Sequence, residues 1–542
     1  MGLVAAASLI WLLIRTGRKP SRITYPCQRA AVANIHIFLL VAFAPLLELK
    51  KIKRSIPSIL GHRFTKTVLL VSSLLLAFGS VTFLSAYLPT PSDQFPIPLY
   101  LHSQRALSPV DTSDLFFVQN ASGFEGNMDN ALSTLLQLME DHGTFFFKTA
   151  GHPSGLIGKA DVVLIKVNCQ WTQRGGTNTD LVKSLIKKVV DHPEGFLGEI
   201  VVADNGQGRG SLDWAESNAY DHSQSMQDVV NAFPSFKVST WLWDSISSRS
   251  VNEYSQGDFN NGYVVNSTQD PVTQIRVSYP KFKTTYGTYI SFKKGIWNTT
   301  TSSYDSGKLK IINVPVLKSH SNYGVTACVK HYMGVVTNSL GTNSHSAVRY
   351  GAMGSVMAEA RFPTLNLLDA VWVNANPIEE SSDCGPATSY DAASFTNVIG
   401  ASQDPVALEY WASKYILIPT AIQLGYTAYS SLDPDYAPIA PGLSESYHNY
   451  LTRSMNELKN AGYQVTMNES EMNVYGSLAP VLPGDVNGDS KVDGKDIAIV
   501  SRAYNTTPSD PKWDARADIN GDLKVDGKDI AIVARYYGTY YP

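Results

Sequence analysis

The sequence predicts an α/β body flanked by N-terminal transmembrane helices and a small all-α module at the C-terminus. The body is expected to have a parallel-type sheet with βαβ units and an antiparallel β insertion. Three observations lead to this prediction. Strand-like and helix-like segments alternate in the body, two long apolar stretches open the chain, and segment 485–504 recurs almost unchanged at 518–537. At 542 residues the chain is long enough for two or more domains.

Composition argues against two classes of function. The net charge is −3 and the body has no basic, aromatic-rich stretch, so we expect no nucleic-acid partner. The cysteines Cys27, Cys169, Cys328 and Cys384 include no CxxC pair, which argues against a cysteine-ligated zinc or iron–sulfur site. The chemistry of the body is therefore expected to come from other side chains.

The first hundred or so residues divide into three segments. Residues 1–29 are apolar and basic, residues 30–88 form a membrane region with spans at about 30–49 and 68–88, and residues 89–100 are a proline-rich stalk. The loop between the spans is rich in Lys and Arg, so the positive-inside rule places it in the cytoplasm. This predicts the lipid bilayer as a partner and places the following domains on the extracytoplasmic side.

The body, assigned to residues 101–475, begins with a βαβ unit. Residues 161–167 and 200–203 are short apolar strands, and 180–190 between them has apolar residues at helical spacing. Strand, helix and strand in this order predict parallel pairing. Segment 241–303 is rich in Ser, Thr, Tyr and Asn and contains alternating strands, which predicts the antiparallel insertion.

The sheet is expected to resume after the insertion. Further strands are expected at 311–316, 365–373 and 397–401. Asp404 is a good N-cap and Pro405 suits the first helical position, so a helix is expected from there through Tyr415. The prolines of linker 476–483 mark the boundary with the C-terminal module, residues 484–542.

Segment 311–334 predicts a buried strand followed by a short helix. The strand ends at Lys318, Ser321 and Asn322 can cap the helix, and Gly334 can end it. Sites in α/β proteins form at the carboxyl ends of strands, so we expect these polar residues to lie in a site. The alternative is a solvated loop with two surface lysines.

Six polar residues near strand ends are the candidate catalytic residues. Thr326 and Lys330 are four residues apart, so they would share one face of the short helix and approach the strand end. The polar residues after the two earlier strands would meet them at the same edge of the sheet. The six candidates are Lys166, Asn168, Asp204, Lys318, His320 and Lys330.

A glycine-rich loop follows the second strand. Its residues Gly206, Gly208 and Gly210 are the candidate cofactor-binding positions, because closely spaced glycines allow backbone amides to approach an anion. A flexible turn is the alternative. A metal site in the body is a further alternative, although no HxxxH or HExxH spacing supports it. Its ligands would come from Asp204, Asp369, Asp404, His320, His331 and His345.

The repeated segment has the ligand pattern of a calcium-binding loop. Each copy has Asp at loop positions 1, 5, 9 and 12 and Asn at position 3, and the backbone carbonyl of position 7 adds an oxygen. A helix with regularly spaced apolar residues follows each loop, and an acidic, solvated tail is the alternative. The expected ligands of two Ca²⁺ ions are Asp485, Asn487, Asp489, Lys491, Asp493 and Asp496, then Asp518, Asn520, Asp522, Lys524, Asp526 and Asp529.

The duplicated loop-and-helix unit resembles a type I dockerin domain. It departs from the EF-hand pattern because position 6 is Ser490 or Leu523 instead of Gly, and position 12 is Asp instead of Glu. Loop positions 10 and 11 are Gly-Lys in both copies, where cellulosomal dockerins commonly have Ser or Thr. The resemblance implies calcium-dependent docking to a cohesin-type partner at the cell surface of a prokaryote.

The body resembles the DUF362 family over about 161–419. The motifs that carry the resemblance are Lys166-Val-Asn168, Thr177-Asn-Thr179-Asp180, the Asp204 loop, Pro315-Val-Leu-Lys318-Ser-His320, Gly324-Val-Thr326, Lys330 with Gly334, Leu365-Asn-Leu-Leu-Asp369 and Ser402-Gln-Asp404-Pro405. Family members usually have Asp where this chain has Glu409, and the cysteines of the ferredoxin-type cluster module found in many relatives are absent. The resemblance implies a fold but no particular reaction.

Two classes of function follow from these observations. The first is a membrane-anchored enzyme or binder that holds or acts on a small anionic substrate at the strand-end site. The second is a non-catalytic cell-surface assembly component, and a dockerin-borne protein of polysaccharide breakdown is a further alternative. The arrangement of the six candidates distinguishes these classes, because one shared cleft favours chemistry and scatter over the surface favours a scaffold.

Overall fold

The computed structural model describes residues 112–121, 125–380 and 382–478 of the body and, in the C-terminal module, residues 484–486, 491–507, 510, 512, 514, 517, 519 and 524–538. The two predicted membrane spans and the stalk lie outside this part of the chain. Within it, no helix is both long and apolar enough to cross a bilayer. The predicted fold class is corrected accordingly: transmembrane helices are not part of the fold that the structure describes.

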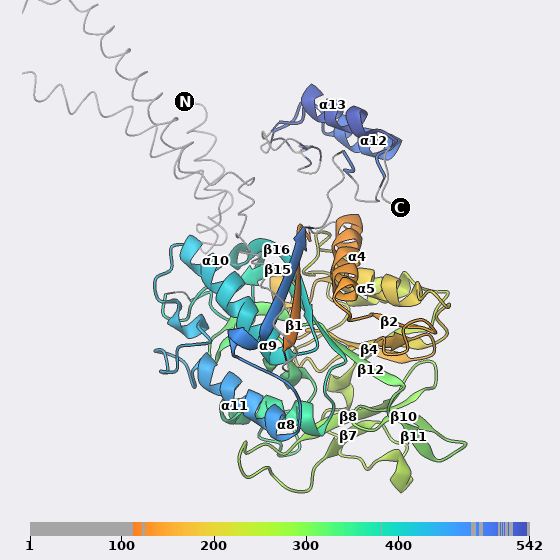
Figure 1. Ribbon diagram of the computed structural model, residues 1–542, viewed down its shortest axis with the longest axis vertical. Coiled ribbons are helices and arrows are strands. Elements are labelled where there is room, and N and C mark those ends of the chain that lie inside the picture. The colour runs from red at the N-terminus through yellow and green to blue at the C-terminus, as the bar shows by residue number, and fades with distance from the viewer. Residues whose placement is uncertain are drawn as a thin grey trace, which may run out of the picture. The chain divides into compact units, whose positions relative to one another are not determined.

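The body is organised around a 10-stranded sheet with the order β17-β1-β16-β15-β12-β4-β5-β6 (Figure 1). Off this path, β13 pairs with β15 and β14 pairs with β13. The strands are β1 (Ser113–Gln119), β4 (Val162–Lys166), β5 (Glu199–Asp204), β6 (Val238–Leu242), β12 (Leu309–Asn313), β13 (Val316–His320), β14 (Gly324–Thr326), β15 (Leu365–Asn374), β16 (Ser394–Ser402) and β17 (Met472–Leu478).

The sheet is mixed, so the predicted parallel-type sheet is wrong for one half of it. Strands β15, β12, β4, β5 and β6 are parallel, whereas β16 runs antiparallel to both β15 and β1. A parallel connection needs a crossover, usually a helix, to return the chain to the same end of the sheet. In the described part of the connection from β15 to β16 the only helical element is the short 3₁₀ turn Tyr390–Ala392, and β16 returns antiparallel.

Both faces of the parallel strands are buried, which explains their continuous apolar sequences. Val163 and Ile165 of β4 face one hydrophobic cluster with α4, α5 and α6, while Val162 and Leu164 face another with α8, α9 and α11. Figure 1 shows α4 and α5 lying together beside the sheet. The helices of the body are α4 (Glu125–Asp141), α5 (Thr179–Val190), α6 (Met226–Asn231), α7 (Ser344–Ala347), α8 (Ala352–Glu359), α9 (Pro405–Ala412), α10 (Ile418–Gln423) and α11 (Tyr447–Asn460).

A second, five-stranded sheet lies between β6 and β12 in the chain. Its order is β11-β10-β9-β8-β7, and all neighbouring strands are antiparallel. It falls almost entirely within the segment that the sequence assigns to an antiparallel insertion. Its strands are β7 (Gly262–Val265), β8 (Ser278–Lys283), β9 (Tyr289–Ser291), β10 (Gly295–Asn298) and β11 (Ser303–Asp305); a separate short pair joins β2 (Phe147–Lys148) and β3 (Ile157–Gly158).

The helix predicted to begin at Ser321 and Asn322 is wrong in its first part, and only the stretch that ends at Gly334 is helical. The chain instead turns back into the hairpin β13–β14, in which Lys318 lies opposite Thr326. Gly324 has a φ of +78°, which suits glycine, and the β-branched residues Val325 and Thr326 favour extended structure over helix. The chain then forms the 3₁₀ helix Lys330–Gly334.

The predicted start of the helix after β16 is confirmed. Asp404 caps α9 by accepting hydrogen bonds from the backbone amides of Val406 and Ala407, and Pro405 occupies the first turn. The helix ends at Ala412 rather than at Tyr415, because the backbone continues as a π-helical turn.

The C-terminal module consists of two related halves. Its helices α12 (Gly494–Arg502) and α13 (Gly527–Tyr536) share a small hydrophobic cluster that includes Val492, Val500, Val525 and Val533. The backbone hydrogen bonds that join the halves include one from the amide of Asn505 to Val525 O (2.7 Å) and one from the amide of Gly538 to Val492 O (2.8 Å). Both bonds connect equivalent positions of the repeat, so each half bonds to the other in the same way.

Candidate functional site

A cavity of about 720 Å³ lies at the carboxyl ends of β4, β5 and β13. All six candidate catalytic residues line it, although they come from three separate regions of the chain. The side chains of Lys166, Lys318 and Lys330 are almost completely buried, which excludes the alternative of a solvated loop with surface lysines. The lining residues that carry the argument are Lys166, Asn168, Asp204, Lys318, His320 and Lys330.

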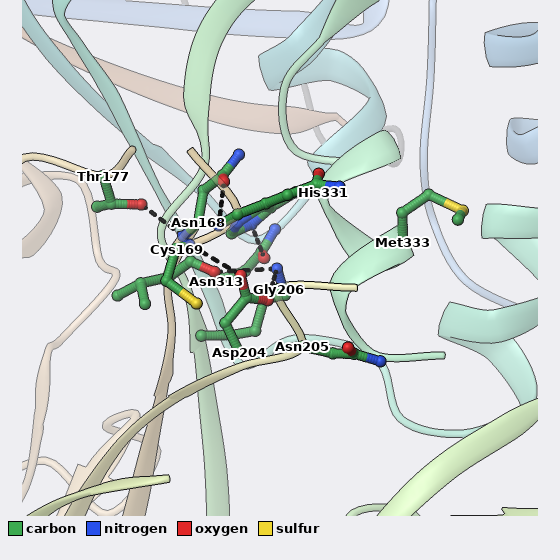
Figure 2. Close-up of polar contacts among 12 residues, drawn as sticks. Asn168, Cys169, Thr177, Asp204, Asn205, Gly206, Asn313, His331 and Met333 are labelled. Carbon is green, nitrogen blue, oxygen red and sulfur yellow. Dashed lines mark hydrogen bonds and ion pairs between the residues drawn. The ribbon is translucent and has the colours of Figure 1, made fainter. Parts of the chain in front are cut away.

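Lys166 and Asp204 form a buried ion pair at one wall of the cavity. They end the neighbouring parallel strands β4 and β5, and Lys166 Nζ lies 2.8 Å from Asp204 Oδ1. Lys166 also donates to Val167 O, and Asp204 Oδ2 accepts from the amide of Cys169 at 2.9 Å (Figure 2). Burial lowers the pKa of Lys166 and raises that of Asp204, while the charge of each partner opposes the shift. Each buried charge is therefore stabilised by the opposite charge of its partner.

Gly334 makes room for this pair. A Cβ atom on Gly334 would overlap both Asp204 Oδ1 and Lys166 Nζ. The sequence suggested only that this glycine ends a helix. Gly334 also allows the 3₁₀ helix to approach the ion pair closely, and this role becomes visible only in the tertiary structure.

Substituting Gly334→Ala is expected to destabilise the protein by about 1–3 kcal/mol, because the added methyl group forces the ion pair or the 3₁₀ helix to move. Urea unfolding of the full chain measures this loss. Gly307→Ala is the matched control, since its Cβ would only contact Asp305 Oδ1 at 3.6 Å. Equal stability of the Gly334→Ala variant and the wild type would contradict the packing argument.

Lys318 is buried beside the pair but has no carboxylate partner among the described residues. Its Nζ donates to the backbone carbonyls of Gly175 and Pro386. Burial, reinforced by the charge of Lys330, lowers the pKa of Lys318 to about 7. Asp369, which lies opposite Val316 on the neighbouring strand β15, is also buried, and burial raises the pKa of its carboxyl group to about 6. Lys318 thus contributes a partly protonated amine to the cavity at neutral pH.

Lys330 is the least constrained of the three lysines. In the described structure its Nζ makes no hydrogen bond and no ion pair, and it lies 5.6 Å from the ring centre of Tyr323. Burial lowers its pKa to about 7 despite the opposing influence of Glu409. Glu409 is itself buried and accepts from the amide of Val329 (2.7 Å) and from the hydroxyl of Tyr450 (3.0 Å). Burial raises the pKa of Glu409 to about 7.

His320 presents one defined hydrogen-bonding group to the cavity. Its Nδ1 accepts from the amide of Asn322 at 3.0 Å, so a neutral ring carries its proton on Nε2. Burial and the charge of Lys330 hold the pKa of His320 well below its usual value, which keeps the ring neutral. His331 is also neutral because burial lowers its pKa, and its Nδ1 lies 2.7 Å from Asn313 Oδ1 (Figure 2).

Asn168 completes the predicted set. The backbone amide of Asn168 donates to Thr177 Oγ1 at 2.7 Å (Figure 2), and the Thr177 hydroxyl in turn donates to Val314 O. These bonds fix the backbone just after β4, while the Asn168 side chain lines the cavity. Its position therefore follows from the end of the strand, as the sequence indicated.

The glycine-rich loop is engaged with a carboxylate of its own chain. The amides of Gly206 and Gly208 donate to Asp244, and the amide of Gly210 donates to Gly206 O at 3.1 Å. A Cβ on Gly206 or Gly210 would overlap the backbone of the other. Gly206 and Gly210 are thus needed for the close backbone approach within the loop. An external anion would have to displace Asp244 to reach the amides of Gly206 and Gly208.

The structure does not bring together the residues considered for a metal site in the body. Among the described residues, no group of three or more His, Cys, Asp or Glu side chains is placed to hold a metal ion. Asp369 does not line the cavity, and Asp404 lies at a separate cavity of about 260 Å³, where it caps α9. His320, His331 and His345 do line the main cavity.

Sequence reasoning missed the segment that closes another side of the cavity. This segment, within 382–392, follows β15 and contributes several lining residues, including Asp383, Cys384 and Pro386. Arg209 and Trp171 also line the cavity, with the guanidinium carbon 5.6 Å from the indole ring centre. Arg209 belongs to the glycine-rich loop that the sequence marks, whereas no local pattern marks Trp171 or the segment within 382–392, because their place depends on contacts between distant segments.

In the C-terminal module, the described part of each calcium loop is held by its position-12 carboxylate. Asp496 accepts from the amides of Val486 and Asp493, both at 2.8 Å, and is completely buried. Asp529 makes the equivalent bonds to the amides of Ile519 and Asp526. Asp485, Lys491 and Lys524 are also described, whereas Asn487, Asp489, Asp518, Asn520 and Asp522 lie outside the described residues.

This arrangement fits calcium. The donor set is made only of carboxylate, amide and backbone oxygens, which Ca²⁺ prefers. Asp496 and Asp529 close their loops by binding the backbone at positions 2 and 9, and this closure brings the two ends of each loop together. Bound calcium would supply the positive charge that such a concentration of carboxylates needs.

Comparison with known families identifies two segments of the chain. Residues 308–414 match the domain of unknown function DUF362, and residues 483–537 match the type I dockerin domain. No curated protein and no solved structure matches the chain significantly. The first match includes Lys318, His320, Lys330 and Glu409, whereas Lys166 and Asp204 precede it. The chain thus carries a DUF362 segment in its body and, at its C-terminus, a type I dockerin domain, which is a calcium-binding module for docking to a cohesin.

Proposed function

We propose that the body binds a small anionic ligand in the 720 Å³ cavity and that the dockerin module attaches it to a cohesin-bearing partner in an extracellular or cell-surface assembly. The volume is typical of a small-molecule site. The observation that carries the first part is the pair of buried amines of Lys318 and Lys330, which face the cavity without a carboxylate partner in the described structure.

The charge of the lining supports an anion. Among the described lining residues, the Lys and Arg side chains outnumber the carboxylates: Lys166, Arg209, Lys318 and Lys330 against Asp204 and Asp383. Asp204 is already paired with Lys166. A buried, unpaired ammonium group is unfavourable, so a ligand that supplies negative charge gains the interaction that the protein itself does not provide.

Anion binding is expected to take up protons. An anion beside Lys318 and Lys330 raises their pKa values from about 7, so amines that are neutral at pH values above 7 become protonated on binding. Affinity should therefore be highest below pH 7 and fall as pH rises toward the raised pKa values, by up to about tenfold per pH unit for each lysine that takes up a proton.

Isothermal titration calorimetry with inorganic phosphate, sulfate and pyruvate measures the affinity for each anion. Repeating the titration in two buffers of different ionisation enthalpy gives the number of protons taken up on binding. Lys318→Met and Lys330→Met are each expected to weaken binding about tenfold or more, the loss of a charge-assisted contact. Lys308→Met, at an exposed lysine away from the cavity, is the control. Absence of binding by all three anions, or unchanged affinity in both cavity variants, would refute the proposal and favour a purely structural role for the body.

A further inference from the structure

We infer that Lys330 is an amine nucleophile that forms an imine with a carbonyl group of the ligand, so that the ligand class is that of small oxo acids. This inference rests on the proposed anion site, because it names the chemical class that the same cavity takes. The carboxylate of such a ligand would meet the positive charge of the cavity, and its ketone or aldehyde group would meet Lys330.

Lys330 differs from the other two cavity lysines in its freedom to react. Lys166 is bound to Asp204 and to Val167 O, and Lys318 donates to two backbone carbonyls. Lys330 is only 6% exposed and lines the cavity, yet its Nζ makes no hydrogen bond or ion pair in the described structure. An amine lone pair is available for attack only when the nitrogen is neither protonated nor committed to another partner.

The environment of Lys330 also keeps part of it neutral. Burial lowers its pKa to about 7, so close to half of the amine is unprotonated near that pH. The carboxyl group of Glu409 acts in the opposite direction, but burial has raised its own pKa to about 7. The two groups therefore titrate in the same range, and neither imposes a permanent charge on the other.

His320 supplies a donor for the carbonyl oxygen of the ligand. Its Nδ1 accepts from the amide of Asn322, which leaves the proton of the neutral ring on Nε2 at the cavity. His320 and Lys330 line the same cavity, and the charge of Lys330 contributes to the low pKa of His320. A neutral imidazole N–H can polarise a carbonyl group and stabilise the negative charge that develops on its oxygen during attack.

The reaction balances without an additional reagent. The unprotonated Nζ forms a bond to the carbonyl carbon, and the π electron pair moves to the oxygen, which takes up a proton. A proton then moves from the nitrogen to the hydroxyl group, which restores the nitrogen lone pair, and this lone pair forms the C=N bond as the C–O bond breaks and water leaves. Overall, an ammonium group and a carbonyl group give a protonated imine and water, so the positive charge stays at Nζ near Tyr323 and Glu409.

Reductive trapping tests the inference on the full chain. The protein is incubated separately with glyoxylate, pyruvate and 2-oxoglutarate in the presence of sodium cyanoborohydride, and peptide mass spectrometry locates the reduced adducts. We expect at least one oxo acid to modify Lys330 about tenfold or more faster than the exposed Lys308, with a rate that rises from pH 6 to pH 8 as the amine deprotonates. Lactate, which has no carbonyl group for the amine to attack apart from its carboxylate, should give no adduct.

Two comparisons separate this inference from the proposed function. Lys330→Arg retains the charge but removes the nucleophile, so it should lose the adduct while calorimetry still detects anion binding. Excess phosphate should protect Lys330 in the wild-type protein, which tests the site even where the variant fails to fold. Anion binding without faster trapping of Lys330 by any of the three oxo acids would overturn the inference alone. Failure of every anion to bind would overturn the proposed function as well.

Discussion

Removing calcium is expected to unfold the C-terminal module and to abolish its docking to a cohesin. Ten oxygen-bearing side chains, five in each loop, include eight carboxylates, which concentrate negative charge in a small unit whose described core is the cluster around Val500 and Val533. Without a cation these carboxylates repel one another, and so small a core offers little compensation. Each bound ion would stabilise the folded state by about 2.7 kcal/mol at a hundredfold excess over its dissociation constant.

Far-UV circular dichroism of residues 481–542 measures this effect directly. The helical signal should appear at about 10⁻⁴–10⁻³ M calcium and disappear with a chelator. The double substitution Asp496→Ala with Asp529→Ala should remove the response, because both buried carboxylates are lost. Lys491→Ala with Lys524→Ala is the matched control, since position 7 is expected to contribute only its backbone carbonyl. Equal helicity with and without chelator would refute calcium-dependent folding.

Breaking the Lys166–Asp204 pair should cause the largest loss of stability in the body. Either Lys166→Met or Asp204→Leu leaves the remaining charge buried and uncompensated, at a cost of about 3–5 kcal/mol. Removing both residues should cost less than the sum of the two single changes, because no unpaired charge then remains. The double variant still lacks the acceptor for the amide of Cys169, so some loss persists.

Urea unfolding of the full chain in excess calcium, followed by tryptophan fluorescence, gives the required double-mutant cycle. Lys159→Met is the control, because the Lys159–Glu194 pair is 3.3 Å apart but largely exposed, and should cost less than about 1 kcal/mol. Additive losses for Lys166→Met and Asp204→Leu would contradict an ion pair that depends on mutual compensation.

The candidate site shows how far strand ends can be predicted from sequence. Lys166, Asp204 and Lys318 could be placed in one site because each belongs to the end of an apolar strand, and strand ends of a parallel sheet meet at one edge. The helix expected between Ser321 and Gly334 begins instead as the hairpin β13–β14 and becomes helical only in the 3₁₀ helix Lys330–Gly334, yet both parts contribute residues to the same cavity. The position of a side chain was thus more predictable than the local structure that carries it.

The sequence alone determined the features whose parts are contiguous in the chain. The calcium loops, their following helices and the cap of α9 each depend on residues within one short segment, where spacing specifies geometry. The tertiary structure decided the antiparallel direction of β16, the space left by Gly334, the engagement of the glycine loop by Asp244 and the position of Glu409 beside Lys330. These features join segments far apart in sequence, and their geometry depends on the packing of the whole body rather than on the propensity of any one segment.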